Sequence, residues 1–175
     1  LMKAIKHELE KLAKDQKVHK DKVRVTVIGN LFMLPEDVRK AAAKVMEATK
    51  NYDNYHLNLA IAYGGREEIA EASRRLARLA VEKKIKVDDI NEKLLSDNLY
   101  SRLPDVDLLI RTSEQRISGF LPWQSTYAEI VFLPERLFPD LSKKDFIKAL
   151  SPRGPGSRIR CRWSGKIQNA NILAS

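Results

Sequence analysis

Residues 23–37 read VRVTVIGNLFMLPED, a pattern typical of a strand followed by a helix. Residues 23–28 are rich in β-branched side chains, which favour an extended strand, and Gly29 with Asn30 marks the turn that ends it. Pro35 fits the first turn of a helix, and the two acidic residues after it favour the positive end of the helix dipole. The segment therefore predicts one strand that is followed directly by one helix.

The same alternation extends in both directions along the chain. Apolar residues at helical spacing predict a helix over about the first 15 residues. The other expected elements are strands at 56–63, 106–110 and 127–133, and helices from 66, around 89–95 and from 142. Strands that alternate with helices predict an α/β fold with a largely parallel sheet flanked by helices. Because ligands bind beyond the carboxyl ends of such strands, a site is expected after Ile28, Ala62 or Ile110.

The charge of the chain is concentrated at its end. The net charge is +9, but residues 151–175 hold five basic residues and no acid, which leaves +4 on the first 150 residues. That value is not the basic footprint of a dedicated nucleic-acid binder, so no nucleic-acid partner is expected. No apolar run approaches the roughly 18 residues of a membrane span, and the lone Cys161 can form neither an internal disulfide nor a zinc cage. A cytoplasmic protein is expected, with peripheral contact to a membrane left open.

The densest group of chemically useful side chains begins where the third expected strand ends. Arg111 and Arg116 carry planar, permanently charged groups that suit phosphate oxygens, and Ser118 with nearby backbone amides can complete an anion site. Glu129 offers the hard carboxylate oxygen that Mg²⁺ prefers beside substrate phosphates. A metal-assisted diphosphate site fits this pattern. The alternative is a surface network in which the arginines pair with Glu114 and Glu129.

The order of residues in this region resembles the cis-prenyltransferases, the undecaprenyl diphosphate synthase family of isoprenyl transferases. The shared segments are Val27-Ile28-Gly29, Tyr63-Gly64-Gly65-Arg66, Arg111-Thr112-Ser113, Glu114, Arg116-Ile117-Ser118, Phe120-Leu121, Trp123-Gln124, Tyr127-Ala128-Glu129 and Phe138-Pro139-Asp140. The resemblance covers residues 1–150, and the sequence Gly119-Phe120-Leu121-Pro122 is closer to archaeal than to bacterial members.

The resemblance implies an Mg²⁺-dependent isoprenyl transferase. Such an enzyme adds isopentenyl diphosphate to an allylic diphosphate, farnesyl or geranylgeranyl, and builds a long-chain polyprenyl diphosphate, the precursor of a lipid carrier. Carried over by position, the residues that would bind isopentenyl diphosphate are Arg111, Arg116, Ile117 and Ser118, and Glu129 would bind Mg²⁺. The family also implies a homodimer and an apolar tunnel for the growing product.

The sequence departs from the family pattern at several points. The family's opening strand and Asp-Gly-Asn phosphate loop, which carries the catalytic Asp, do not occur in this chain. The fold is therefore expected to be N-terminally incomplete and its activity impaired. A glycine is missing between Ser113 and Glu114. Ala62 stands where bacterial members have Asn, and Asn30 stands where Asp is usual.

Two regions are expected from these observations. Residues 1–150 would form a cis-prenyltransferase-like α/β domain, the carboxyl-terminal portion of the family fold. Residues 151–175 would be an atypical, poorly ordered basic tail, because they combine turn composition with no periodicity. The alternative function is a non-catalytic subunit that binds an active cis-prenyltransferase, although such a subunit would not need the arginines and carboxylate of the site. A basic nucleic-acid binder is the second alternative.

Overall fold

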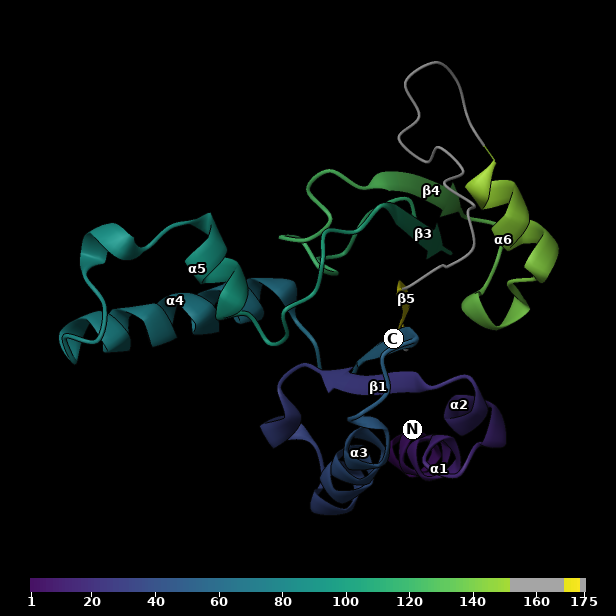
Figure 1. The fold of residues 1–175 in the computed structure, drawn as a ribbon. Coiled ribbons are helices and arrows are strands. Elements are labelled where there is room, and N and C mark those ends of the chain that lie inside the picture. Colours follow the sequence, from purple (N-terminus) through teal and green to yellow (C-terminus); the bar gives the residue numbers. More distant parts are fainter. Residues whose placement is uncertain (152–168, 174–175) are drawn as a thin grey trace. The chain divides into compact units, whose positions relative to one another are not determined.

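A computed structural model of the chain describes residues 1–151 and 169–173 (Figure 1). The chain forms two compact units. The first unit consists of residues 1–64 together with the strand at 169–173, and the second unit begins at Gly65. Most of the expected tail, including Cys161, lies outside the described residues. The division into a domain and a tail at residue 150 stays a prediction.

The first unit is built on a parallel sheet of three strands in the order β1-β2-β5. Its elements are α1 (Met2–Leu12), α2 (Gln16–Lys20), β1 (Val23–Ile28), the 3₁₀ helix η1 (Leu31–Met33), α3 (Glu36–Thr49), β2 (Tyr55–Ala60) and β5 (Asn169–Leu173). β5 falls within the segment that the sequence predicts to be poorly ordered. Its pairing has a physical reason, because β2 would otherwise leave a row of backbone N–H and C=O groups without partners.

The core of the first unit lies between β1, α1 and α3, and Figure 1 shows both helices on the same side of β1. β1 buries Val25 and Val27, which alternate along the strand, and α3 buries Val38, Ala42 and Val45, which recur at helical spacing. These two periods are the ones that a strand and a helix impose on their buried faces. The strand and helix predicted from the stretch at 23–37 are confirmed.

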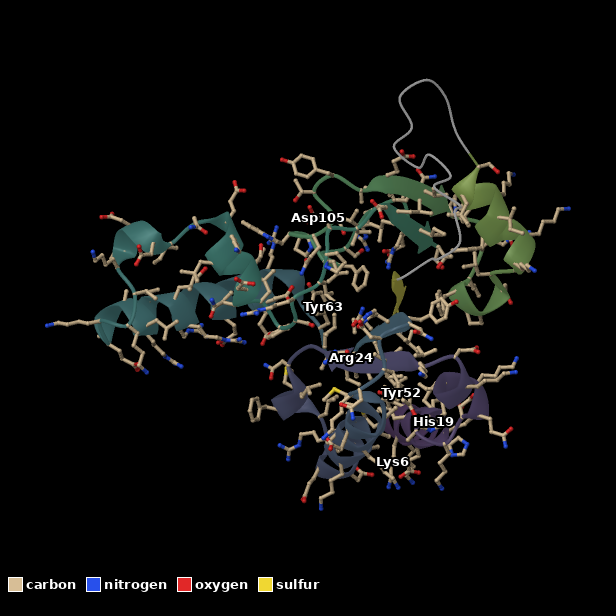
Figure 2. The ribbon with its side chains drawn as sticks, in the orientation of Figure 1. Lys6, His19, Arg24, Tyr52, Tyr63 and Asp105 are labelled. Atoms are coloured by element: carbon tan, nitrogen blue, oxygen red, sulfur yellow. The ribbon has the colours of Figure 1, made fainter. Side chains whose placement is uncertain are left out.

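Two polar side chains fasten the helices of the first unit. Thr49 Oγ1 is fully buried and accepts a hydrogen bond from the backbone N–H of Val25 at 3.0 Å. The ring of His19 contacts the Tyr52 hydroxyl at 2.9 Å and the Ala13 carbonyl at 3.0 Å (Figure 2). His19 therefore ties α2 to the segments around it, which is a structural role.

The second unit contains a separate parallel pair of strands, β3 and β4. Its elements are α4 (Gly65–Val81), η2 (Val87–Asp89), α5 (Glu92–Asp97), β3 (Leu108–Thr112), β4 (Glu129–Leu133), η3 (Phe138–Asp140) and α6 (Lys143–Leu150). α6 begins with a capping box, in which Ser142 and Asp145 each accept a hydrogen bond from the backbone of the other. The predicted α/β class with parallel strands and helices is confirmed, although the described strands form two sheets. Within the described residues, no helix has both the length and the apolar character that crossing a membrane requires.

Candidate functional site

The site predicted by the sequence begins at the end of β3, where the chain turns sharply. Ser113 has a φ of 65°, in the left-handed region, and its N–H donates to the carbonyls of Leu133 and Arg136 at 3.2 and 2.9 Å. The N–H of Glu114 donates to the carbonyl of Thr112 at 2.7 Å. This tight turn places the Glu114 carboxylate beside the last side chains of β3.

Glu114 lies at the centre of a cluster that contains three of the predicted site residues. Its Oε2 accepts hydrogen bonds from Arg111 Nη2 at 2.8 Å, Arg116 Nε at 3.0 Å and Ser118 Oγ at 3.2 Å. Its Oε1 accepts one from Arg116 Nη2 at 2.8 Å. We call these four residues the Glu114 cluster. In the structure, the three predicted donors thus all bind one carboxylate. Pairing of the arginines with Glu114 is part of the surface network that the sequence left open as the alternative to a diphosphate site.

The Glu114 cluster combines two guanidinium groups with one carboxylate. Hydrogen bonds from Arg116 and Arg111 hold the pKa of Glu114 well below its usual range, at about 2. The same carboxylate raises the pKa of Arg116. Arg111 is the less exposed guanidinium, with 20% of its side chain accessible against 71% for Arg116. Its Nε is buried and has no hydrogen-bond partner among the described residues, whereas its Nη2 donates to Glu114 Oε2 at 2.8 Å and to Ser118 Oγ at 3.3 Å.

The loop that carries Ser118 has left-handed backbone at three positions. The φ angles are 47° at Ser118, 76° at Gly119 and 44° at Leu121. The side chains of Leu121 and Phe120 are buried and anchor this strained loop. The predicted site residue Ile117 precedes Ser118 in the same loop and is exposed.

Gly65, the first residue of α4, lies against this loop. A Cβ at position 65 would lie 2.2 Å from the carbonyl oxygen of Gly119 and 2.3 Å from Cδ of Pro122. A residue with a side chain would therefore displace the loop, which makes Gly65 a positioning residue for Ser118. The sequence predicts only a tight strand-to-helix turn at Gly64 and Gly65, and no local pattern reveals this long-range approach.

Glu129, the predicted metal ligand, is not part of the Glu114 cluster. It begins β4 opposite Leu108, and its N–H donates to the carbonyl of Asp107 at 3.0 Å. Arg111 lies about 10 Å further along β3 than Leu108. Because side chains alternate between the faces of a strand and Arg111 follows Leu108 by an odd number of residues, the side chains of Arg111 and Glu129 lie on opposite faces of the strand pair. Among residues 1–151, no group of three His, Cys, Asp or Glu side chains could hold a metal ion. A single carboxylate used together with phosphate oxygens is still a donor set that suits Mg²⁺.

Known proteins resemble this chain over most of its length. Residues 1–152 match the family model described as "Putative undecaprenyl diphosphate synthase". The tritrans,polycis-undecaprenyl-diphosphate synthase (geranylgeranyl-diphosphate specific) of Thermoplasma volcanium is 52% identical over 141 residues, and that of Thermoplasma acidophilum is 46% identical over 152 residues. The matches cover 79% and 86% of this chain but only 54% and 58% of those relatives. The chain therefore spans little more than half the length of the curated relatives that it matches.

Solved structures support the same relationship. Lavandulyl diphosphate synthase from Lavandula x intermedia, in complex with dimethylallyl diphosphate, matches with a TM-score of 0.75 and 32% identity, covering 93% of this chain and 66% of that one. A probable undecaprenyl diphosphate synthase from Campylobacter jejuni matches with a TM-score of 0.70 and 38% identity, covering 83% and 65%. The family model, the curated relatives and the shared fold agree: the chain belongs to the cis-prenyltransferase family.

Proposed function

We propose that the protein to which this chain belongs transfers cis-prenyl units. It would add isopentenyl diphosphate repeatedly to an allylic diphosphate and build a polyprenyl diphosphate, the precursor of a lipid carrier. The observation that carries the proposal is the Glu114 cluster, in which Arg111, Arg116 and Ser118 direct their donors to one anionic group. The names of the archaeal relatives favour geranylgeranyl diphosphate over farnesyl diphosphate as the allylic primer.

The proposed roles follow from the chemistry of each side chain. Arg111 and Arg116 would bind the diphosphate of isopentenyl diphosphate as forked cations, and the Ser118 hydroxyl would donate to a phosphate oxygen. Ile117 lies between these residues and would contact the bound substrate. Held in this way, the substrate meets the allylic partner in one orientation, which lowers the entropic part of the barrier.

Glu129 would hold Mg²⁺ together with phosphate oxygens of the substrates. When bound, the ion would stabilise the negative charge on the departing diphosphate. In the full-length enzyme Glu129→Gln should lose Mg²⁺-dependent turnover while it keeps the fold, whereas Arg116→Ala should mainly raise the Michaelis constant for isopentenyl diphosphate. Turnover of Glu129→Gln at the parent rate would remove Glu129 from the metal site. An unchanged Michaelis constant in Arg116→Ala would remove Arg116 from the diphosphate site.

The direct test is incorporation of labelled isopentenyl diphosphate into butanol-extractable product, with Mg²⁺ and geranylgeranyl diphosphate. It should be made with this chain and with a version extended by the family's amino-terminal phosphate-loop region. We expect activity in the extended version alone. Activity in the short chain would show that the family's catalytic loop is dispensable here. No activity in either version would favour the non-catalytic partner subunit.

We further propose a cytoplasmic homodimer that touches membranes through an exposed basic face. The support for membrane contact is a set of exposed cationic residues on α4 and just after it, of which Arg74 pairs with Glu71 and Lys84 with Glu82. The set is Arg74, Arg75, Arg78, Lys83, Lys84 and Lys86. Such residues attract anionic lipid headgroups. Sedimentation should give a dimer, and co-sedimentation with phosphatidylserine vesicles should fall as salt rises. A monomer at all concentrations, or binding that is independent of salt, would contradict these two proposals.

A further inference from the structure

The Glu114 carboxylate uses most of the donors that the proposed function assigns to the substrate. Both of its oxygens are engaged, Oε1 by one donor and Oε2 by three. Arg116 contacts the two oxygens through Nε and Nη2, the forked arrangement that a guanidinium also makes with phosphate. A diphosphate cannot receive these hydrogen bonds while Glu114 holds them.

The carboxylate does not leave the site by taking up a proton. The two arginines keep the pKa of Glu114 at about 2, so its carboxylate is ionised at neutral pH. It can leave by moving, because 39% of its side chain is exposed and because it stands in the turn after β3 rather than in a strand or helix. Rotation of the side chain toward solvent would release Arg111, Arg116 and Ser118 together.

Glu114 leaves one strong donor unused. Arg111 Nε is buried without a hydrogen-bond partner among the described residues, although Nη2 of the same side chain reaches the carboxylate. A diphosphate carries more acceptor oxygens and more charge than a carboxylate, so it can receive hydrogen bonds from more of the N–H groups of Arg111 and Arg116 at once. This difference gives a diphosphate an advantage over the resident carboxylate that a small monovalent anion lacks.

We propose that Glu114 is an internal counter-ion that occupies the diphosphate position in the substrate-free protein and is displaced when the diphosphate enters. The inference rests on the proposed function and specifies how the site selects its ligand. Glu114 keeps the two arginines oriented before binding. An incoming anion has to bind the arginines more strongly than the Glu114 carboxylate does, and weakly binding anions such as chloride do not. The selectivity for a diphosphate then comes from competition within the chain itself.

The test is binding of inorganic pyrophosphate, measured by isothermal titration calorimetry on this chain. Glu114→Gln keeps the shape of the side chain but removes its charge, and we expect it to bind pyrophosphate about tenfold more tightly than the parent. Glu135→Gln is the matched control, because it removes the same charge from an exposed position of the second unit. Its affinity should stay within about twofold of the parent's, since an exposed charge outside the cluster is screened by salt. The added variant Glu114→Gln with Arg116→Ala should lose the gain, which would place the gain in the cluster.

The outcomes separate this inference from the proposed function. If the parent binds pyrophosphate and Glu114→Gln binds it equally or more weakly, the counter-ion role is wrong while the diphosphate site stands. If neither chain binds pyrophosphate, the diphosphate site itself is refuted and the counter-ion role falls with it. Glu114→Asp covers the case in which Glu114→Gln does not fold, since its shorter carboxylate cannot reach all three partners. It should bind more tightly than the parent, and weaker binding would overturn the inference.

Discussion

Gly65→Ala is the change that best tests how the second unit is assembled. The added Cβ would stand 2.2 Å from the Gly119 oxygen, and carbon and oxygen in contact need about 3.2 Å, so one of the two segments has to move by about 1 Å. The second obstacle, Cδ of Pro122 at 2.3 Å, belongs to a ring that cannot rotate away. Neither obstacle is the far end of a flexible side chain.

The cost can be worked out from these contacts. Overpacking of this kind costs about 1–3 kcal/mol, and the better helix propensity of alanine returns at most about 1 kcal/mol. We therefore expect Gly65→Ala to lower the free energy of unfolding by about 2 kcal/mol and the Tm by about 4–8 °C. Because the displaced loop carries Ser118, pyrophosphate binding should weaken at a temperature where the variant is still folded.

The measurement is thermal unfolding followed by circular dichroism, with Gly119→Ala as the control. A Cβ at position 119 meets nothing within 4 Å, but φ there is 76°, so the cost is conformational only and about 1–2 kcal/mol. Gly65→Ala should destabilise the chain at least as much, through a steric clash instead of an unfavourable backbone angle. A Tm for Gly65→Ala at or above that of the parent would show that α4 does not approach the loop as described.

The remaining predictions concern the first unit and the Glu114 cluster. Thr49→Val should lower the free energy of unfolding by about 1–3 kcal/mol in urea, because it leaves the buried N–H of Val25 without an acceptor; Thr49→Ser should retain most of the stability. Ala62→Asn should raise the free energy of unfolding by about 1 kcal/mol, since φ at this position is 49° and asparagine tolerates left-handed backbone better than alanine; no gain in urea would contradict this. Because the folded pKa of Glu114 lies below its unfolded value, its stabilising contribution is present above pH 4.5 and is lost as the pH falls toward 2, so the Tm of the parent should drop more steeply over that window than the Tm of Glu114→Gln.

The features that the sequence predicts well are local. β1 and the start of α3 follow from β-branched residues, a proline and two acids within one short stretch, and the capping box of α6 involves residues three apart. Arg111, Arg116 and Ser118 are likewise close in the chain, so a single turn at Ser113 is enough to gather them. In each case the residues that determine the structure are close together in the sequence.

The features that the sequence does not predict depend on register and on distant segments. The position of Glu129 relative to Arg111 depends on the offset of β4 against β3, and a residue pattern does not specify that offset. The pairing of β2 with β5 joins segments more than 100 residues apart. Gly65 likewise lies against the loop that contains Gly119 and Pro122, more than 50 residues further along the chain. A pair of glycines predicts a turn but does not predict which distant segment packs against it. Long-range packing decides all three.

The strained backbone around the Glu114 cluster has its own explanation. Three residues with side chains, Ser113, Ser118 and Leu121, have left-handed φ angles there, at a cost of about 1–2 kcal/mol each. Glycine would remove that cost, but it would also remove a contact at every position: Ser113 Oγ donates to the Arg136 carbonyl at 3.2 Å, Ser118 Oγ donates to Glu114, and the Leu121 side chain is buried. At each of these positions the side chain therefore makes a contact that holds the turn or the loop in place, or that keeps the Ser118 hydroxyl beside Glu114. Donors fixed in this way need little rearrangement when an anion arrives, which is the condition under which electrostatic stabilisation is most effective.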